Sequence, residues 1–376
     1  MNNITDKMGV FSARMIKELI AAGNIKAQEV IQEEHIQPAS LDLRLGNMAY
    51  QIKASFLPGG YSSILDKIEA LDLLIDTIDL TRPNILQKGC VYVVPLLEQL
   101  SLPANVSARA NPRSTSGRLD VFVRLLTDFG TVYEDVPQGY EGQLYVEIVP
   151  RTFSVLMSKG SRLNQLRFIY GKPLTSDTEL TTLHNKETIV CFADRLPCEA
   201  KIGDGLLLTV NLQGYKGQGG VIGYKAKRDA PILDFNKVNH YDSAGFWETV
   251  YCPEKRGLVL NPNDLYILTS KENVRVPPAY AAEMVAFEPS MGEFRVHYAG
   301  FFDPGFGYGN NNEVDGTPAV LEVRAHDAPF IIEDGQLIAR LLYFPLVEPA
   351  TKIYGTSIGS SYQFQKLTLS KQFKKL

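Results

Sequence analysis

The pattern of apolar and polar positions predicts one amphipathic helix close to the start of the chain. In the stretch SARMIKELIAAGNI, the apolar residues Met15, Ile16 and Leu19 recur at helical spacing. Ser12 precedes them with a hydroxyl that suits a helix N-cap, and Gly23 suits the residue that follows a helix. We therefore expect a short helix between Ser12 and Gly23.

After this helix the chain changes to short apolar or alternating runs that are separated by Gly, Pro, Asn and Asp. Runs of this length with turn residues between them are typical of β-strands. The clearest runs are SLDLRLG, CVYVVPL, QLYVEIV, GLLLTVNLQG, DLYILTS, AVLEVRA and LIARLLYF. The pattern therefore predicts a mostly β fold with a few short helices at its periphery.

The two halves of the chain resemble each other when one is shifted by about 175 residues. The shift places SLPANV over VPPAYA and LYVEIV over AVLEVR, so that Glu147 aligns with Glu322 and Asp128 with Asp303. One ungapped offset holds for about 65 residues, which indicates two copies of a single β unit.

The length of 376 residues is enough for two domains, each with its own core. We predict a first repeat over residues 1–172, a less regular connector over 173–200 and a second repeat over 201–376. Only the second repeat is followed by a tail, KIYGTSIGSSYQFQKLTLSKQF, which is either a lid over a site or a frayed end.

The composition and net charge of the chain limit the kinds of molecule that we expect it to bind. Hydrophobic residues make up 45% of the chain and charged residues 21%, and the formal net charge is −4, values typical of a soluble globular protein. No run of like charge is long enough to be a nucleic-acid arm, so we expect no duplex DNA or RNA partner. A single nucleotide is compatible with this charge.

Other sequence features point to a cytoplasmic protein without zinc. The four cysteines are scattered and form no C-x-x-C pair, which favours thiols in a reducing compartment. The five histidines are also dispersed, without the spacing of a zinc site. The N-terminus is not that of a signal peptide, and no 18-residue apolar run occurs, so we expect no membrane segment.

The stretch ARANPRSTSGRLD, Ala108–Asp120, gathers three arginines, three hydroxyl side chains and a glycine in one short segment. Guanidinium groups and hydroxyls are suited to phosphate oxygens, although a solvated loop is the simpler interpretation. The second repeat has FEPSMGE at the corresponding place, where Glu288 replaces Arg113 and Glu293 replaces Arg118. We therefore expect an anion site on the first repeat only.

Acidic residues at three places are candidates for chemistry on a substrate. Glu147 and Glu322 each lie within an alternating strand, on a face shared with apolar side chains, where a raised pKa would suit a general acid/base. An outward glutamate on a half-exposed strand is the alternative. Asp303 lies in an Asp-Pro-Gly turn, where turn formation alone would also account for it.

Four motifs taken together resemble those of the dCTP deaminase family, which has a trimeric dUTPase-like β fold. They are IQPASLDLRLG, RSTSGR, DPGFG with AVLEVRA, and SSYQFQ, and they follow one another in the family's order. The resemblance covers most of the chain as a duplicated unit, and the long tandem bacterial form is the most similar. It implies two tandem dUTPase-like β-barrel or jelly-roll domains that deaminate dCTP to dUTP and ammonia in pyrimidine deoxynucleotide metabolism.

The resemblance also assigns roles to the candidate residues. The implied catalytic residues are Glu322 as the proton shuttle, Ser114 and Arg118 around the attacking water, and Ala299 through its backbone, with Glu147 as the rival base. The implied nucleotide-binding residues are Arg113, Ser114, Thr115, Asp303, Tyr354, Tyr362 and Gln365, with Asp128 in the rival arrangement. The family implies Mg²⁺ bound with the triphosphate and no zinc.

Sites in single-copy members of the family lie between subunits of a trimer. The resemblance therefore implies a composite site, with the phosphate turn from the first repeat and the base-binding hairpin and tail from the second. It also implies a homo-oligomer with a pseudo-trimeric arrangement of repeats. Two alternatives stay open: a dUTPase or bifunctional dCTP deaminase/dUTP diphosphatase, and a nucleotide-binding regulatory module without turnover.

Overall fold

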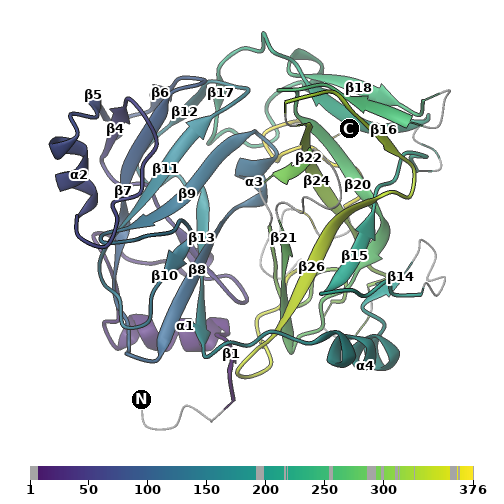
Figure 1. Cartoon of the computed structure of the whole chain (residues 1–376), viewed down its shortest axis with the longest axis horizontal. Coiled ribbons are helices and arrows are strands. Elements are labelled where there is room, and N and C mark those ends of the chain that lie inside the picture. Colours follow the sequence, from purple (N-terminus) through teal and green to yellow (C-terminus); the bar gives the residue numbers. More distant parts are fainter. Residues whose placement is uncertain are drawn as a thin grey trace. The chain divides into compact units, whose positions relative to one another are not determined.

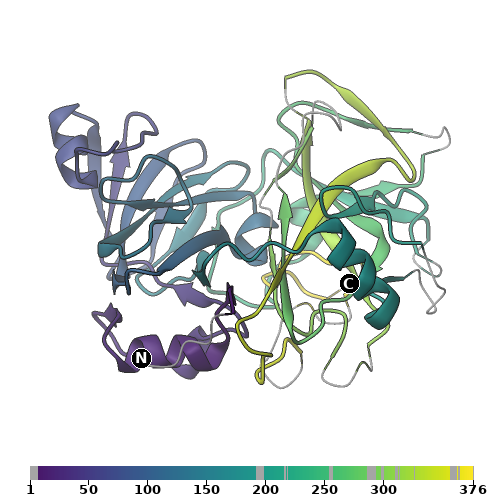
Figure 2. The same cartoon turned by 60° about the horizontal axis from the view of Figure 1, so that its bottom comes forward.

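The computed structural model describes residues 7–191, 199–215, 217, 219–253, 257–285, 294–297, 300–309, 312, 314–325, 327–355, 362 and 365–375. The chain divides into two compact units (Figures 1 and 2). Unit 1 comprises Met1–Pro173, Ala230–His240 and Leu346–Thr351, and unit 2 comprises Leu174–Asp229, Tyr241–Pro345 and Lys352–Leu376. Each unit is described below by itself.

The helices of unit 1 are short. They are α1 (Ala13–Ala21), α2 (Ile64–Ala70) and α3 (Ser114–Gly117), with a 3-10 turn η1 (Glu33–His35). Helix α1 confirms the expected helix, because the Ser12 hydroxyl accepts a hydrogen bond from the Met15 N–H at 3.5 Å. Its apolar side, with Ile16 and Leu19 fully buried, packs into the core of unit 1.

Three sheets make up the rest of unit 1. Its strands are β1 (Gly9–Val10), β2 (Ile25–Ala27), β3 (Leu41–Leu43), β4 (Met48–Ile52), β5 (Leu74–Asp79), β6 (Asn84–Leu86), β7 (Val91–Ser101), β8 (Val106–Pro112), β9 (Val121–Thr127), β10 (Asp135–Val136), β11 (Glu141–Pro150), β12 (Val155–Met157), β13 (Asn164–Tyr170) and β17 (Leu233–Asp234). The largest sheet has the order β5-β4-β7-β11-β9, with β2 beside β7. The others run β1-β13-β8-β10, with β3 on β13, and β17-β12-β6.

Unit 2 has one α-helix among its described residues, α4 (Asp177–Glu187), and a 3-10 turn η3 (Ser243–Gly245). Its strands are β14 (Val190–Cys191), β15 (Leu206–Thr209), β16 (Val221–Ala226), β18 (Trp247–Tyr251), β19 (Gly257–Leu260), β20 (Tyr266–Val274), β21 (Tyr280–Val285), β22 (Phe294–His297), β23 (Phe301–Phe302), β24 (Thr317–Ala325), β25 (Phe330–Glu333) and β26 (Leu337–Pro345). The largest sheet has the order β18-β16-β20-β24-β22, with β14 beside β20.

The two largest sheets therefore have the same strand order, element for element. The strands β5, β4, β7, β11, β9 and β2 of unit 1 correspond to β18, β16, β20, β24, β22 and β14 of unit 2. The mostly β fold expected from the alternating runs is confirmed, and the topology repeats as the sequence offset indicated.

The segment expected as a connector, residues 173–200, contains secondary structure that belongs to unit 2. Helix α4 precedes β14 as α1 precedes β2, and unit 2 begins at Leu174. The apolar stripe of α4 is weak, because Leu180 and Leu183 are its only buried residues. A helix with so little periodicity is hard to distinguish from a linker in sequence.

Two segments from the later part of the chain complete unit 1. Within Ala230–His240, β17 pairs parallel with β12, so that Val155 lies opposite Leu233. Within Leu346–Thr351, Leu346 bridges to Val10, and Glu348 accepts a hydrogen bond of 2.6 Å from the Ser12 hydroxyl. Unit 1 therefore depends on residues from both halves of the sequence.

The loop between β9 and β10 of unit 1 contains a carboxyl group with a strongly shifted pKa. Glu134 follows β9, and its Oε2 accepts a hydrogen bond of 3.1 Å from the Leu125 N–H. Burial raises the pKa of this carboxyl group to about 8, from an ordinary value of 4.5. The folded state therefore holds this proton more tightly than the unfolded state does.

We predict that Glu134→Gln raises the thermal unfolding midpoint at pH 8.5 and has little effect at pH 4.5. A raised folded pKa gives stability that is complete below the unfolded pKa and is lost as pH rises through the folded pKa. Gln keeps an oxygen for the Leu125 N–H and carries no charge. Calorimetry against the exposed Glu141→Gln control checks this; an equal effect at both pH values would contradict it.

Candidate active site

The arginine-rich stretch forms a tight turn between β8 and β9. Arg113 is the N-cap of α3 and Arg118 its C-cap. The Arg113 N–H donates to the Leu163 carbonyl at 2.9 Å, and the Ser116 hydroxyl donates to the same carbonyl at 2.9 Å. Two hydrogen bonds to one carbonyl fix the turn against the loop that leads into β13.

A buried carboxylate forms ion pairs with Arg113 of this turn and with Arg162 of the loop that leads into β13. Asp42 on β3 is buried, and it forms an ion pair with Arg113 and a second, at 3.4 Å, with Arg162. The Arg113 side chain is still 21% exposed. Thr115 and Arg118 are buried, whereas Ser114 is half-buried. The turn therefore presents a pre-oriented guanidinium and a hydroxyl at the surface of unit 1, as a phosphate site requires.

The first hairpin, formed by β9 and β11, contains Glu147 in an ion pair. Glu147 is 1% exposed and lies directly opposite Arg124 in the strand register. Arg124 donates to Oε1 of Glu147 through Nε at 3.1 Å and also through its terminal nitrogen. The Ser55 hydroxyl donates to Oε2, so both carboxylate oxygens are engaged by other side chains.

The guanidinium of Arg124 has further partners, although the Arg124 side chain is 25% exposed. It lies 3.6 Å from the centroid of the Tyr133 ring and donates to the Ser55 hydroxyl at 2.7 Å. The Tyr133 hydroxyl donates to the Phe56 carbonyl at 3.0 Å. Glu147 therefore belongs to a network that contains the Arg124 guanidinium, the Tyr133 ring and the hydroxyls of Ser55 and Tyr133.

Asp128, at the tip of the same hairpin, also has a partner from outside the hairpin. Its Oδ1 accepts a hydrogen bond of 2.8 Å from the Ile64 N–H, at the start of α2. Burial raises the pKa of this carboxyl group. Both acids of the first hairpin are thus bonded to the segment between β4 and β5.

The second hairpin, β22 and β24, carries Glu322 at the corresponding place. Glu322 is 5% exposed and lies opposite Ile267 on one side and His297 on the other. The residue across from the glutamate is therefore His297, where the first hairpin has Arg124.

Strand register corrects one detail of the sequence alignment. The uniform offset equates Arg124 with Ala299, whereas the register equates it with His297. The second hairpin is two residues longer, and both extra residues precede Asp303, because the Asp-to-Glu spacing is the same in the two repeats. Ala299 lies outside the described residues, as do Glu288 and Glu293.

The Asp-Pro-Gly turn of unit 2 supports the beginning of the tail. Asp303 is buried, and the Gly305 N–H donates to the Val276 carbonyl at 2.8 Å. The Tyr354 N–H donates to the Pro304 carbonyl at 2.8 Å, and the Tyr354 ring lies 5.6 Å from that of Phe306. The tail therefore starts on the turn that carries Asp303.

Further along, the described part of the tail packs against the sheet of unit 2. Tyr362 and Gln365 are buried, and Gln365 Nε2 lies 3.4 Å from the Pro318 carbonyl at the start of β24. Phe373, close to the C-terminus, makes an edge-on contact with Trp247 at 6.0 Å. These contacts favour a closed cover over a frayed end.

The residues predicted for the site thus fall into two groups. Arg113, Ser114, Thr115 and Arg118 lie in unit 1 with Asp128 and Glu147, whereas Asp303, Glu322, Tyr354, Tyr362 and Gln365 lie in unit 2. Sequence reasoning missed Arg124, Ser55 and Tyr133 around Glu147. Arg124 was visible as the residue four before Asp128, but its pairing depends on strand register.

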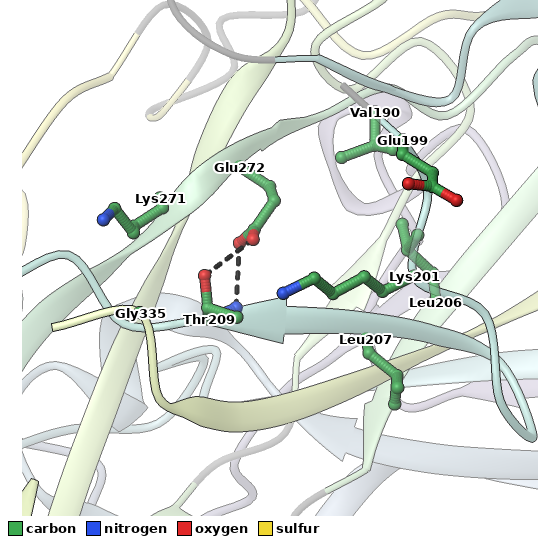
Figure 3. A pocket seen from close by; sticks show the side chains of 9 residues that line it. All are labelled: Val190, Glu199, Lys201, Leu206, Leu207, Thr209, Lys271, Glu272 and Gly335. Carbon is green, nitrogen blue, oxygen red and sulfur yellow. Dashed lines mark hydrogen bonds between the residues drawn. The ribbon is translucent and has the colours of Figure 1, made fainter. Parts of the chain in front are cut away.

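A separate pocket of about 180 Å³ lies in unit 2 (Figure 3). Its lining residues are Val190, Glu199, Lys201, Leu206, Leu207, Thr209, Lys271, Glu272 and Gly335, none of which is a predicted site residue. Glu272 accepts hydrogen bonds from the N–H and the hydroxyl of Thr209, at 2.8 and 2.7 Å, and Lys201 points toward this pair.

Unit 1 shows the physical origin of this pocket. The N–H of Arg44 donates to Glu98 as the N–H of Thr209 donates to Glu272, at 2.9 and 2.8 Å. The Arg44 guanidinium fills the space beyond and forms a buried ion pair of 2.7 Å with Glu98. In unit 2 the Thr209 side chain, which is shorter than that of Arg44, lines the pocket beside Glu272.

Two properties of the described residues bear on metal binding and on membranes. Within the described ranges, no group of three or more His, Cys, Asp or Glu residues is placed to hold a metal ion. Among the described helices, none is both long and apolar enough to cross a membrane.

Comparison with known proteins identifies the family. Residues 7–172 match "2'-deoxycytidine 5'-triphosphate deaminase (DCD) N-terminal domain", and residues 176–373 match the corresponding C-terminal domain. The chain belongs to the dCTP deaminase family. The resemblance inferred from the four motifs is therefore confirmed, and the protein is an enzyme that acts on dCTP.

Individual dCTP deaminases show the same relationship. A "dCTP deaminase, dUMP-forming" from Methanosphaera stadtmanae is 27% identical over 174 residues, which cover 46% of this chain and 83% of the relative. That from Aquifex aeolicus is 30% identical over 162 residues, 42% of this chain and 80% of the relative. The crystal structure of 2'-deoxycytidine 5'-triphosphate deaminase from Agrobacterium tumefaciens is 44% identical, with a TM-score of 0.84, and the match covers 90% of this chain and 99% of that one.

We predict that Gly305→Ala separates the start of the tail from the Asp-Pro-Gly turn. Gly305 has a φ of +92°, and a Cβ there would collide with the Ile353 side chain. Gly335→Ala is a matched control, with a φ of +78° and only the Lys271 Nζ, at 3.8 Å, near its Cβ. Overpacking should make Gly305→Ala less stable than the control by about 1–3 kcal/mol in denaturant unfolding.

The tail itself gives a second readout. Limited proteolysis should cleave the Gly305→Ala variant after residue 352 faster than the Gly335→Ala control. Equal cleavage rates and equal stabilities would show that the tail does not depend on this turn.

Proposed function

We propose that the enzyme hydrolyses the exocyclic amine of dCTP to give dUTP and ammonia, with Glu322 as its general acid/base. The state of the other candidate, Glu147, carries this proposal. Both oxygens of Glu147 are engaged, by Arg124 and by Ser55. A general base must hydrogen-bond the attacking water, whereas both oxygens of Glu147 are already bonded to side chains of the same unit. Glu322 is also buried, and the residue across the strand from it is His297 rather than an arginine.

The reaction needs one water molecule, and the general acid/base moves both of its protons to the substrate, one to N3 and one to the amine. Glu322 takes a proton from water, and the resulting hydroxide attacks C4 of the cytosine ring. Glu322 gives this proton to N3, which forms a tetrahedral intermediate. It then takes the proton of the new C4 hydroxyl and passes it to the amine, so that the C4–N bond breaks, ammonia leaves and the C4 carbonyl of dUTP forms. Ser114, Arg118 and the backbone of Ala299 would orient the water.

Binding residues follow from the chemistry of each part of the nucleotide. The Arg113 guanidinium and the hydroxyls of Ser114 and Thr115 suit the triphosphate, and the ion pair to Asp42 supports this by fixing the Arg113 side chain. Asp303 would accept a hydrogen bond from the deoxyribose hydroxyl. We propose a composite site, in which the turn comes from the first repeat and the hairpin from the second.

The tail supplies the remaining contacts. Tyr354, Tyr362 and Gln365 would cover the bound nucleotide, and the contacts of Tyr354 and Gln365 with the turn and β24 support that role. We propose that Mg²⁺ enters with the substrate, because Mg²⁺ is usually held by phosphate oxygens and water with few protein ligands. A homo-oligomer with a pseudo-trimeric arrangement of repeats, in the cytoplasm, completes the proposal.

A second candidate function is a bifunctional enzyme that releases dUMP and pyrophosphate. It is favoured by the printed name of the relatives from Methanosphaera stadtmanae and Aquifex aeolicus, which are dUMP-forming. Each of them matches less than half of this chain, over 174 and 162 residues. The product therefore has to be identified directly.

We predict that Glu322→Gln abolishes ammonia release, with a loss of at least a hundredfold, because the proton shuttle is removed. Glu147→Gln should retain turnover within about fivefold, since that carboxylate is already committed to Arg124. The assay incubates each purified variant with dCTP and Mg²⁺, measures ammonia, and separates the nucleotides by ion exchange. Calorimetric unfolding of both variants controls for damage to the fold.

The outcomes separate the alternatives. Ammonia with dUTP supports the proposed reaction, and ammonia with dUMP and pyrophosphate supports the bifunctional enzyme. Turnover that survives in Glu322→Gln and is lost in Glu147→Gln would contradict the assignment of the base. Binding of dCTP without any product would favour a regulatory module.

A further inference from the structure

Both repeats carry an insertion at the same place in their topology. In unit 1 the insertion Lys53–Leu73 joins β4 to β5, and in the second repeat Lys227–Phe246 joins β16 to β18. The two insertions have different partners, which distinguishes the two hairpins.

The insertion Lys53–Leu73, which includes α2, folds back onto the hairpin of its own repeat. The Gly59 N–H donates to the Gly130 carbonyl at 3.0 Å, and the Phe129 N–H donates to the Ser62 carbonyl at 3.0 Å. On the hairpin, both bonds are made by the two residues that directly follow Asp128 in the sequence. The insertion is therefore joined to the tip of the hairpin by its backbone.

The same insertion reaches both acids of the hairpin. The Ile64 N–H donates to Asp128 at 2.8 Å, and the Ser55 hydroxyl donates to Glu147. The Phe56 carbonyl accepts from Tyr133 at 3.0 Å. One continuous segment thus provides donors to the two carboxylates that correspond to Asp303 and Glu322.

Apolar packing closes the remaining space. Ile64 and Ile68 of α2 form a buried cluster with Val93, Leu126 and Tyr145 on the sheet of unit 1. Ile64 is completely buried. Because the insertion is tethered at both ends, it makes these contacts without the loss of translational freedom that a separate ligand incurs.

The insertion of the second repeat, Lys227–Phe246, makes different contacts. Its central part, Ala230–His240, belongs to unit 1, where Leu233 and Phe235 donate backbone hydrogen bonds of 3.0 Å to Ser154 and Leu156 beside β12. In unit 2 it is the tail that contacts β24, through Gln365. The hairpin of Glu322 is therefore approached by a segment of a different kind.

We propose that Lys53–Leu73 is an internal occupant of the first hairpin, which takes the place on Asp128 and Glu147 that the nucleoside takes on Asp303 and Glu322. Each chain accordingly binds one dCTP, at the second hairpin, although it contains two copies of the fold. This inference rests on the proposed function for the location of the working hairpin. The closure of the first hairpin is tested independently below.

The first experiment measures stoichiometry. Isothermal titration of the full-length Glu322→Gln variant with dCTP and Mg²⁺ should give one dCTP per chain. Two dCTP per chain would overturn the inference while leaving the proposed reaction intact. Absence of binding would contradict the proposed function, and the exchange measurement described next would then decide on the closure by itself.

Amide hydrogen exchange reports on the closure directly. Peptides that contain Gly59, Ile64 and Phe129 should be protected in the free enzyme and should not change when dCTP is added, because their amides are bonded within the closed hairpin. Rapid exchange in the free enzyme, or opening of these peptides by dCTP, would overturn the inference.

A matched pair of variants on α2 separates closure from catalysis. Ile68→Ser should increase exchange in the insertion at least tenfold, because Ile68 is buried, yet leave dCTP turnover within about twofold. Leu65→Ser, at a position 43% exposed on the same helix, should change neither. A tenfold fall in turnover for Ile68→Ser, with the global unfolding midpoint unchanged, would show that this hairpin takes part in the reaction.

Discussion

A buried carboxylate must be ion-paired, hydrogen-bonded or protonated, and this constraint shapes both hairpins of the enzyme. In the first hairpin Glu147 meets it with Arg124 directly across the strand and with the Ser55 hydroxyl. Removal of Arg124 would leave the charge uncompensated, so Arg124 and Glu147 stabilise the hairpin only as a pair. In the second hairpin the residue across from Glu322 is a histidine. At this register position the first hairpin therefore has an arginine facing its glutamate, and the second hairpin does not.

The duplication has allowed the two repeats to specialise in complementary ways. The first repeat keeps the arginines of its turn, with Arg113 held by Asp42, while its hairpin is closed by its own insertion. The second repeat has glutamates at the corresponding turn positions but carries the Asp-Pro-Gly turn and the tail. A single-copy enzyme must keep every part functional in every copy, whereas a tandem chain has to keep each part only once. Unit 1 also includes two segments from the second half of the chain, Ala230–His240 and Leu346–Thr351.

The sequence predicts the strands and the repeat because these depend on local patterns. Alternating runs such as LYVEIV specify a strand with two faces, and the offset that aligns Glu147 with Glu322 is visible without any structure. Three features are out of reach of such patterns. Helix α4 buries only Leu180 and Leu183, so its periodicity is too weak to separate it from a linker. The two-residue shift that places His297 opposite Glu322 is a matter of strand register. The role of Lys53–Leu73 depends on contacts between residues far apart in the sequence, such as that of Ile64 with Asp128, 64 positions away.

The central claim is that the cytosine ring meets Glu322 and not Glu147. It is tested most directly by a crystal structure of the Glu322→Gln variant with dCTP and Mg²⁺. The account predicts electron density for the ring within hydrogen-bond distance of residue 322, and for the triphosphate beside Arg113 and Ser114, with Lys53–Leu73 still seated on the first hairpin. A ring bound beside Glu147, with Arg124 and the insertion displaced, would contradict it.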